Sequence, residues 1–481
     1  MSTRNDIGHS TVGFRSERGP ILAALMLTTG LIAIDATILA TAVPSIVADL
    51  GHFAEFPWLF SVYLLAQAVS VPIYSKLADT IGRKPIVLIG IGLFLLGSIL
   101  AGLAWSMTVL IVFRVIQGLG AGAAGPMAMT IVGDIYTVEE RALVQGYIAS
   151  VWAVASVVGP ALGGVFSQFV SWRWIFLVNI PLCLIAAFAL GRSFHETVQP
   201  RRHRIDVAGA ASLTVGLTAV ILGLLEGGNA WAWWSLPSAL SFAVGVLALV
   251  VFVAVERRAA EPVLDLRLLR RPLILTTTLV SLGVGSLLIG ITSFVPPYLQ
   301  NALGATPIVA GAAVAALTLG WPLASSVAGR VYLRYGFRLT VLLGASIALV
   351  GSIALALLGP EPNVVAVGAV AFVIGFGLGW TAAPSLIAAQ ASVEWQERGV
   401  VTGLNVFARS VGSAVGVAVL GAIANHLIAA GRGEHDYATI VDASTWVFRA
   451  VAATAALTLI ASARMPSGAV DSAAFSPEAT S

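Results

Sequence analysis

Three charged residues lie far inside otherwise apolar runs of the sequence: Asp35, Arg114 and Arg409. Asp35 has the clearest chemistry, because burial disfavours the charged form of a carboxyl group and so promotes uptake of a proton. A carboxyl that is neutral in one state and charged in another can carry protons. We therefore predict that Asp35 is a proton carrier. The alternatives are a structural hydrogen bond or a partnership with a buried arginine.

The two arginines allow more than one interpretation. Arg114 is expected in the outer half of its run, where a structural role would be to bond backbone carbonyls or to reach toward the membrane surface. Arg409 belongs to no recognisable motif, and we interpret it as a candidate for substrate contact. We place Thr37 and Gln67 with Arg409 at the same candidate substrate cavity.

The composition of the chain indicates which kind of secondary structure positions Asp35, Arg114 and Arg409. The 481-residue chain is 58% hydrophobic and 10% charged, with a mean hydropathy of +0.94, which excludes a soluble globule. About 20 apolar residues cross a bilayer as a helix. The sequence therefore predicts an all-α membrane protein with fourteen spans, at residues 20–48, 54–78, 85–104, 106–130, 141–166, 172–194, 205–226, 235–255, 272–299, 306–330, 339–359, 362–386, 399–424 and 444–463.

These spans place Asp35 near the midplane of the first helix, where an acid costs roughly 2.5–3.5 kcal/mol. No other span carries an Asp or Glu at comparable depth. Most of the 26 Lys and Arg residues fall on one side if the N-terminus is cytoplasmic, and the positive-inside rule favours that orientation. We expect a multi-pass protein of the plasma membrane with both termini in the cytoplasm.

The chain also contains an internal repeat. The loop at residues 75–84 returns 254 residues later at 329–338, and residues 114–120 and Glu140-Arg141 return at 371–377 and Glu397-Arg398, both 257 residues later. A duplicated membrane domain explains these offsets. Basic segments bracket the seventh and eighth spans and mark boundaries. The expected domains are an N-terminal tail at 1–19, a six-helix bundle at 20–194, two linker helices with basic loops at 195–271, a second six-helix bundle at 272–463, and a C-terminal tail at 464–481.

Several chemistries are disfavoured by what the sequence lacks. It contains no phosphate-cradling G-x-x-x-x-G-K, no Cys/His cluster with zinc spacing, and loops too short to hold a Ser/His/Asp site. Its single cysteine, Cys183, lies within an apolar run, so an intrachain disulfide is excluded. We expect neither an enzyme nor a metal site, and no organic cofactor.

The loop Ser75-Lys-Leu-Ala-Asp-Thr-Ile-Gly-Arg-Lys84 resembles the loop signature of the major facilitator superfamily, with Ser75 in place of the usual glycine. Residues 34–44, I-D-A-T-I-L-A-T-A-V-P, resemble the first-helix signature of its fourteen-helix drug:proton antiporter branch, with alanine in place of asparagine. Residues 155–164, A-S-V-V-G-P-A-L-G-G, resemble the exporter motif of the fifth helix, with alanine for the first glycine. The resemblance extends from the first span to the last.

This resemblance implies a major facilitator fold of two six-helix bundles with two inserted helices. It also implies a proton-coupled antiporter that exports small amphipathic or lipophilic compounds by alternating access, driven by the proton motive force. The motif R-x-x-Q-G at Arg114 resembles a family element tied to proton coupling. Asp79, Arg83 and Asp134 correspond to a charge relay that latches the two halves, in which the loop acid meets a helix N-terminus near Gly399.

The exporter motif comprises Gly159, Pro160, Gly163 and Gly164. Proline bends a helix and glycines permit close helix approach, so we expect an inter-domain gasket; ordinary glycine packing is the alternative. For the loop 75–84, the alternative is an ordinary solvated loop.

Two rival functions also fit the sequence: a lipid or lipid-like amphiphile transporter with lateral access between helices, and a transporter-like receptor that binds without turnover. The expected partners are small amphipathic molecules, protons and membrane lipids, with no nucleic acid, and the expected state is a monomer. Residues 306–328 carry no acid, which favours neutral or monovalent substrates over dications.

Overall fold

The computed structural model describes residues 13–136, 138–194, 196, 206–260, 262–358, 363–394, 397–431 and 436–466. Every named element within these residues is a helix. Fourteen of the described segments are long and apolar enough to cross a membrane, which confirms the predicted all-α membrane fold.

The helices follow the predicted order. The N-terminal bundle contains α1 Gly19–Leu50, α2 Phe56–Ile81, α3 Arg83–Gly102, α4 Met107–Ile135, α5 Val138–Val165, the π-helical turn η2 Phe166–Val170, α6 Trp174–Leu177 and α7 Asn179–Ser193. The inserted pair is α8 Val207–Glu226 and α9 Leu236–Glu256. The C-terminal bundle contains α10 Pro272–Asn301, α11 Pro307–Tyr335, α12 Phe337–Ala356, α13 Val364–Ala391, α14 Arg398–Ala430 and α15 Tyr437–Ala463, and short 3₁₀ turns occur at η1 Phe53–Glu55 and η3 Leu268–Arg270.

The predicted spans differ from the helices by a few residues at several ends, and two differences have a clear local cause. The sixth is broken at Val178, because Pro181 has no N–H to donate to the carbonyl of Leu177. The last begins at Tyr437 rather than at 444. Asp436 accepts a hydrogen bond from the amide of Thr439 at 3.0 Å and thereby starts the helix ahead of its apolar part.

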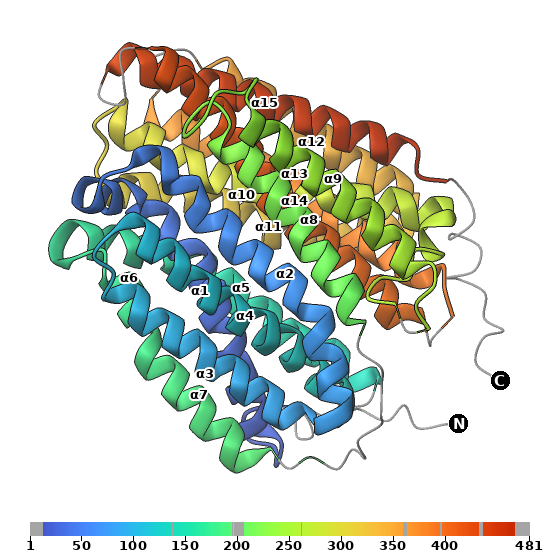
Figure 1. Cartoon of the computed structure of the whole chain (residues 1–481). Coiled ribbons are helices and arrows are strands. Elements are labelled where there is room, and N and C mark those ends of the chain that lie inside the picture. Colours follow the sequence, from blue (N-terminus) through green and yellow to red (C-terminus); the bar gives the residue numbers. More distant parts are fainter. Residues whose placement is uncertain are drawn as a thin grey trace, which may run out of the picture.

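The two bundles lie side by side, with the N-terminal helices coloured blue to green and the C-terminal helices yellow to red (Figure 1). Helix α8 of the inserted pair packs against α2 of one bundle and α14 of the other, and α9 packs on α8. The inserted pair therefore contacts both bundles. We call the side where α1 begins and α15 ends the terminal side, and the opposite side the distal side.

The bundles touch each other on the distal side. A Cβ atom added at Gly164 of α5 would lie 2.8 Å from the Cα atom of Ile308 in α11, so these helices meet closely because residue 164 has no side chain. Nearby, Gln300 Nε2 donates a hydrogen bond to the carbonyl of Thr41 at 3.2 Å. The N-terminal and C-terminal bundles are therefore in direct contact on the distal side.

Candidate functional site

Asp35 and Arg114 form an ion pair in the interior of the N-terminal bundle. Arg114 Nη1 donates to Asp35 Oδ2 at 2.8 Å, and both side chains are at most 2% exposed. Gln117 Nε2 donates to the other carboxylate oxygen, Asp35 Oδ1, also at 2.8 Å. Both oxygens of the carboxylate are therefore occupied by donors from α4.

Arg114 keeps three further contacts that do not depend on Asp35. Its Nε donates to the carbonyl of Leu59 at 3.1 Å, and its Nη1 also donates to Gln117 Oε1 at 2.6 Å. The guanidinium carbon lies 4.0 Å from the centre of the Tyr63 ring, a cation–π distance. If Asp35 accepted a proton, the guanidinium would retain a carbonyl, an amide oxygen and an aromatic face.

Close helix approach brings these groups together. An added Cβ at Gly97 of α3 would lie 2.6 Å from the backbone nitrogen of Gln117, and one at Gly118 would lie 2.5 Å from the carbonyl of Tyr63 in α2. Two glycines thus let α3 and α2 approach α4 on either side. As a result Ser98 of α3 accepts a hydrogen bond from Gln117 Nε2 at 2.9 Å.

The observed contacts of Asp35 and Arg114 match the structural alternatives named for each residue. Asp35 is the partner of a buried arginine, and Arg114 does bond a backbone carbonyl. Gln117, Ser98 and Tyr63 were not among the predicted site residues. Gln117 had a sequence signal, since it is the glutamine of the R-x-x-Q-G motif.

The loop after α2 is clamped within its own bundle. The side chain of Glu196 accepts hydrogen bonds from the backbone amides of Arg83 at 2.7 Å and Lys84 at 3.3 Å, which are the first residues of α3. Gly82 has φ +103°, which favours glycine, and a Cβ there would lie 2.5 Å from a Glu196 oxygen. Glu196 therefore caps α3, and a carboxylate is favourable at a helix N-terminus.

Lys84 makes the reciprocal contact with the end of α7. Its Nζ donates to the carbonyls of Gly191 at 2.8 Å and Phe194 at 2.6 Å. The Arg83 side chain is half-buried. The side chains of Asp79 and Asp134 lie outside the described part of the structure, so the latch stays a prediction.

The exporter motif lies along α1. A Cβ at Gly159 would meet the hydroxyl of Thr37, and one at Gly163 would meet the carbonyl of Ile38. The carbonyl of Pro160 would lie 2.7 Å from a Cβ at Gly311, in α11 of the other bundle. The motif therefore sits where α5 is packed between the two bundles.

The three predicted cavity residues have different surroundings. Thr37 is buried, and its hydroxyl donates to the carbonyl of Ala155 in α5 at 3.1 Å. Gln67 is half-buried on α2. Arg409 of α14 is exposed. The described structure shows no contact between Thr37 and Arg409, which lie on helices of different bundles.

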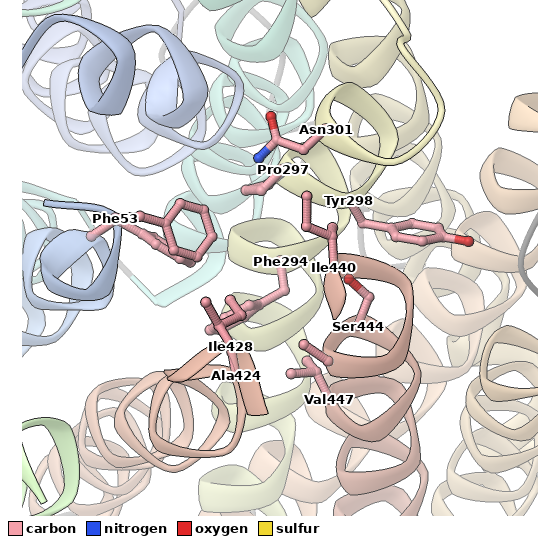
Figure 2. Close-up of a pocket in the computed structure, with 12 residues that line it drawn as sticks. Phe53, Phe294, Pro297, Tyr298, Asn301, Ala424, Ile428, Ile440, Ser444 and Val447 are labelled. Atoms are coloured by element: carbon pink, nitrogen blue, oxygen red, sulfur yellow. The ribbon is translucent and has the colours of Figure 1, made fainter. Parts of the chain in front are cut away.

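A separate apolar pocket opens on the distal side (Figure 2). Its lining comes from the distal ends of helices in both bundles: Phe53, Phe56, Phe294, Pro297, Tyr298, Asn301, Ala424, Ile428, Ile440, Ala443, Ser444 and Val447. None of these side chains is charged. The pocket therefore offers no group for proton exchange, and the buried Asp35 cluster is the better candidate for that chemistry.

Known structures share this architecture. The structure of the peptide transporter POT in complex with sulfate matches with a TM-score of 0.67 at 15% identity, over 97% of each chain. The D-xylose-proton symporter matches with a TM-score of 0.64 at 12% identity, over 94% of this chain and 98% of that one. These similarities establish the fold of a membrane transporter.

Sequence comparison identifies the family. The Major Facilitator Superfamily profile matches residues 25–204 and 191–417. Multidrug transporter protein MdtP of Bacillus subtilis (strain 168) is 32% identical over 416 residues, covering 86% of this chain and 77% of that protein. Multidrug resistance protein 3 of the same strain is 32% identical over 403 residues, covering 84% and 79%. The chain belongs to the Major Facilitator Superfamily and is a multi-pass membrane transporter.

The buried ion pair makes a stability prediction. Arg114→Gln should lower the free energy of unfolding by about 3–5 kcal/mol, because it leaves the Asp35 carboxylate buried without its charged partner. Asp35→Asn should cost less, because the guanidinium keeps its contacts with Leu59, Gln117 and Tyr63. The double variant should lose much less than the sum. Denaturation of the purified protein in detergent, analysed as a double-mutant cycle, measures this coupling.

The matched control is the ion pair between Arg173 and Asp49, which has a similar N–O distance of 2.7 Å but is partly exposed on both sides. Arg173→Gln and Asp49→Asn should couple by about 0–1 kcal/mol. Strictly additive losses at Asp35 and Arg114 would mean that the pair is not a coupled unit.

The α3 cap makes a second prediction. Glu196→Ala should speed amide hydrogen exchange at Arg83 and Lys84 by about fivefold, because it removes the acceptor of both amides and such a cap contributes about 1 kcal/mol. Hydrogen exchange mass spectrometry reports it. Glu17→Ala, at an exposed acid, should leave these amides unchanged. Unaltered exchange in Glu196→Ala would show that the amides do not rely on Glu196.

Proposed function

We propose that this transporter is a proton-coupled antiporter that exports small amphipathic or lipophilic compounds across the plasma membrane. The observation that carries the proposal is the buried cluster of Asp35, Arg114 and Gln117. The relatives named as multidrug transporters and efflux pumps support the direction of transport and the substrate class.

In this proposal the cluster exchanges one proton in each cycle. With Asp35 ionised, the charges of Asp35 and Arg114 cancel. A proton that binds Asp35 gives the cluster a net charge of +1 and weakens the bond to Arg114 Nη1. The remaining contacts of Arg114 with Leu59, Gln117 and Tyr63 then hold the guanidinium in place. The fold can therefore accommodate both protonation states.

Proton exchange must accompany a change in access, because Asp35 is only 1% exposed in this structure. The closely packed distal contact at Gly164 and Ile308 is the kind of interface that would separate when the transporter opens to that side. We assign the terminal side to the cytoplasm. On that side Asp79, Arg83 and Asp134 would act as the latch. The residues of the exporter motif in α5 would seal the contact between the bundles: Gly159, Pro160, Gly163 and Gly164.

The proton gradient supplies enough free energy for this work. An inward proton releases roughly 2.3 kcal/mol per 100 mV and about 1.4 kcal/mol per pH unit. At 100 mV and one pH unit, one proton per cycle then sustains a substrate gradient of roughly several hundredfold. The proposed transporter needs no cofactor besides this gradient, and it works as a monomer among membrane lipids.

The test uses proteoliposomes and an imposed pH step. Asp35→Asn should abolish uphill accumulation of an amphipathic dye while retaining downhill exchange, because asparagine mimics a permanently protonated carboxyl that cannot release its proton. Dye gradients are recorded with and without the pH step.

The control is Asp49→Asn, which makes the same substitution on the same helix at an acid that is also paired with an arginine but lies near its distal end. It should accumulate dye like the wild type. Near wild-type uphill accumulation by Asp35→Asn would place the proton route elsewhere.

A further inference from the structure

Arg409 is a cation in the middle of a membrane-spanning helix whose side chain has no partner in the described structure. The residue is exposed, whereas Arg114, another deep arginine, is buried and bound to Asp35. Arg409 lies 11 residues from the start of α14 at Arg398, which is about 16 Å along the helix. In a hydrocarbon core about 30 Å thick, that position is far from either surface.

The face of α14 that carries Arg409 turns toward its own bundle. Thr402, seven residues earlier, accepts a hydrogen bond from α13, and Asn405, four residues earlier, accepts one from α10, each at 2.7 Å. Residues four and seven apart share a helix face. Ala414 lies on another face and accepts from α2 at 3.1 Å. The Arg409 side chain is thus directed between α10 and α13 rather than toward lipid.

The internal repeat gives Arg409 an aromatic counterpart. Its equivalent in the first half, 257 residues earlier, is Trp152 of α5, and that side chain is 44% exposed. The two halves are parallel repeats related by an axis along the membrane normal, so equivalent positions lie at similar depth. One half therefore presents a cation and the other a large aromatic ring, which suits a molecule with an anionic head and an apolar body.

The other charged side chains deep in the membrane also favour a ligand with a negative charge. Asp35 is compensated by Arg114, and Arg449, which lies 12 residues into α15, stacks on Trp446, so among the described side chains at this depth Arg409 is the charge without a partner. A cationic substrate would be repelled there. An anionic group would supply the partner that the guanidinium lacks, and arginine binds carboxylate, sulfonate and phosphate oxygens through its forked N–H groups.

We propose that Arg409 is a substrate-binding residue that selects amphipathic compounds with an anionic head group. The inference rests on the proposed export function and narrows its substrate class. The anionic group belongs either to a free amphiphile or to a lipid head group, and both share the chemistry that Arg409 recognises.

Two aryl amines with the same ring system test this selectivity. 8-Anilino-1-naphthalenesulfonate carries a sulfonate, and N-phenyl-1-naphthylamine does not. Binding is measured as the difference between phosphatidylcholine nanodiscs with and without the full-length protein. Arg409→Gln should weaken binding of the sulfonate about tenfold and leave that of the neutral amine within about twofold. Arg409→Lys should retain most of the sulfonate binding because it keeps the charge.

The matched control is Arg449→Gln, which removes an exposed arginine of α15 that stacks on Trp446, and it should leave both affinities unchanged. Three results would overturn the proposal: no sulfonate binding by wild type, equal losses of both probes in Arg409→Gln, or the same selective loss in Arg449→Gln. Equal losses would indicate a general effect on the fold.

A second binding experiment, with an anionic lipid added to the nanodiscs, identifies the source of the anion. If phosphatidylglycerol in the nanodisc weakens binding of the sulfonate to the wild type but not to Arg409→Gln, the anion is a lipid head group. Undiminished binding indicates a free amphiphile. Both outcomes support an anionic ligand at Arg409. Binding needs no pH gradient, so a failure here is distinct from a failure of the Asp35 proposal.

Discussion

The central constraint on this structure is the need to satisfy two opposite charges in the interior of the N-terminal bundle. An unpaired Asp35 or Arg114 would cost several kcal/mol in surroundings that exclude water. Each is therefore bonded to the other, and Gln117 bonds both. Glycines on α3 and α4 let the surrounding helices approach closely enough to complete the network. Close helix packing thus supports the two residues that are most costly to bury.

The hydrogen bonds around Arg114 also allow the fold to tolerate neutralisation of Asp35. Arg114 is held by a carbonyl, an amide and an aromatic ring in addition to the carboxylate, so neutralising Asp35 removes one partner among four. An isolated acid at this depth would lack that compensation. The contacts at Gly164 and Gln300 hold the two bundles together on the distal side, and we propose that protonation biases this interface. The inserted α8 contacts both bundles and can follow their movement.

Much of the fold could be predicted because span length and hydropathy depend on local sequence alone. The fourteen spans and the depth of Asp35 follow from them. The break at Val178 and the early start of α15 at Tyr437 do not follow from hydropathy, since one depends on a backbone hydrogen bond that Pro181 cannot donate and the other on the cap that Asp436 provides. The pairing of Asp35 with Arg114 joins residues 79 apart and the cap of Lys84 by Glu196 joins residues 112 apart. No spacing rule encodes such contacts, and the duplicated bundle does not repeat the ion pair, since Ala371 stands where Arg114 would recur.

The most direct measurement of the central claim is infrared spectroscopy of the protein in membranes during a pH titration. The account predicts a protonated carboxyl band that grows as the pH falls through the range in which transport occurs and that is absent from Asp35→Asn. The Asp49→Asn protein should keep the band. A band of the same size in Asp35→Asn, or an Asp35 that stays ionised throughout that range, would contradict the account.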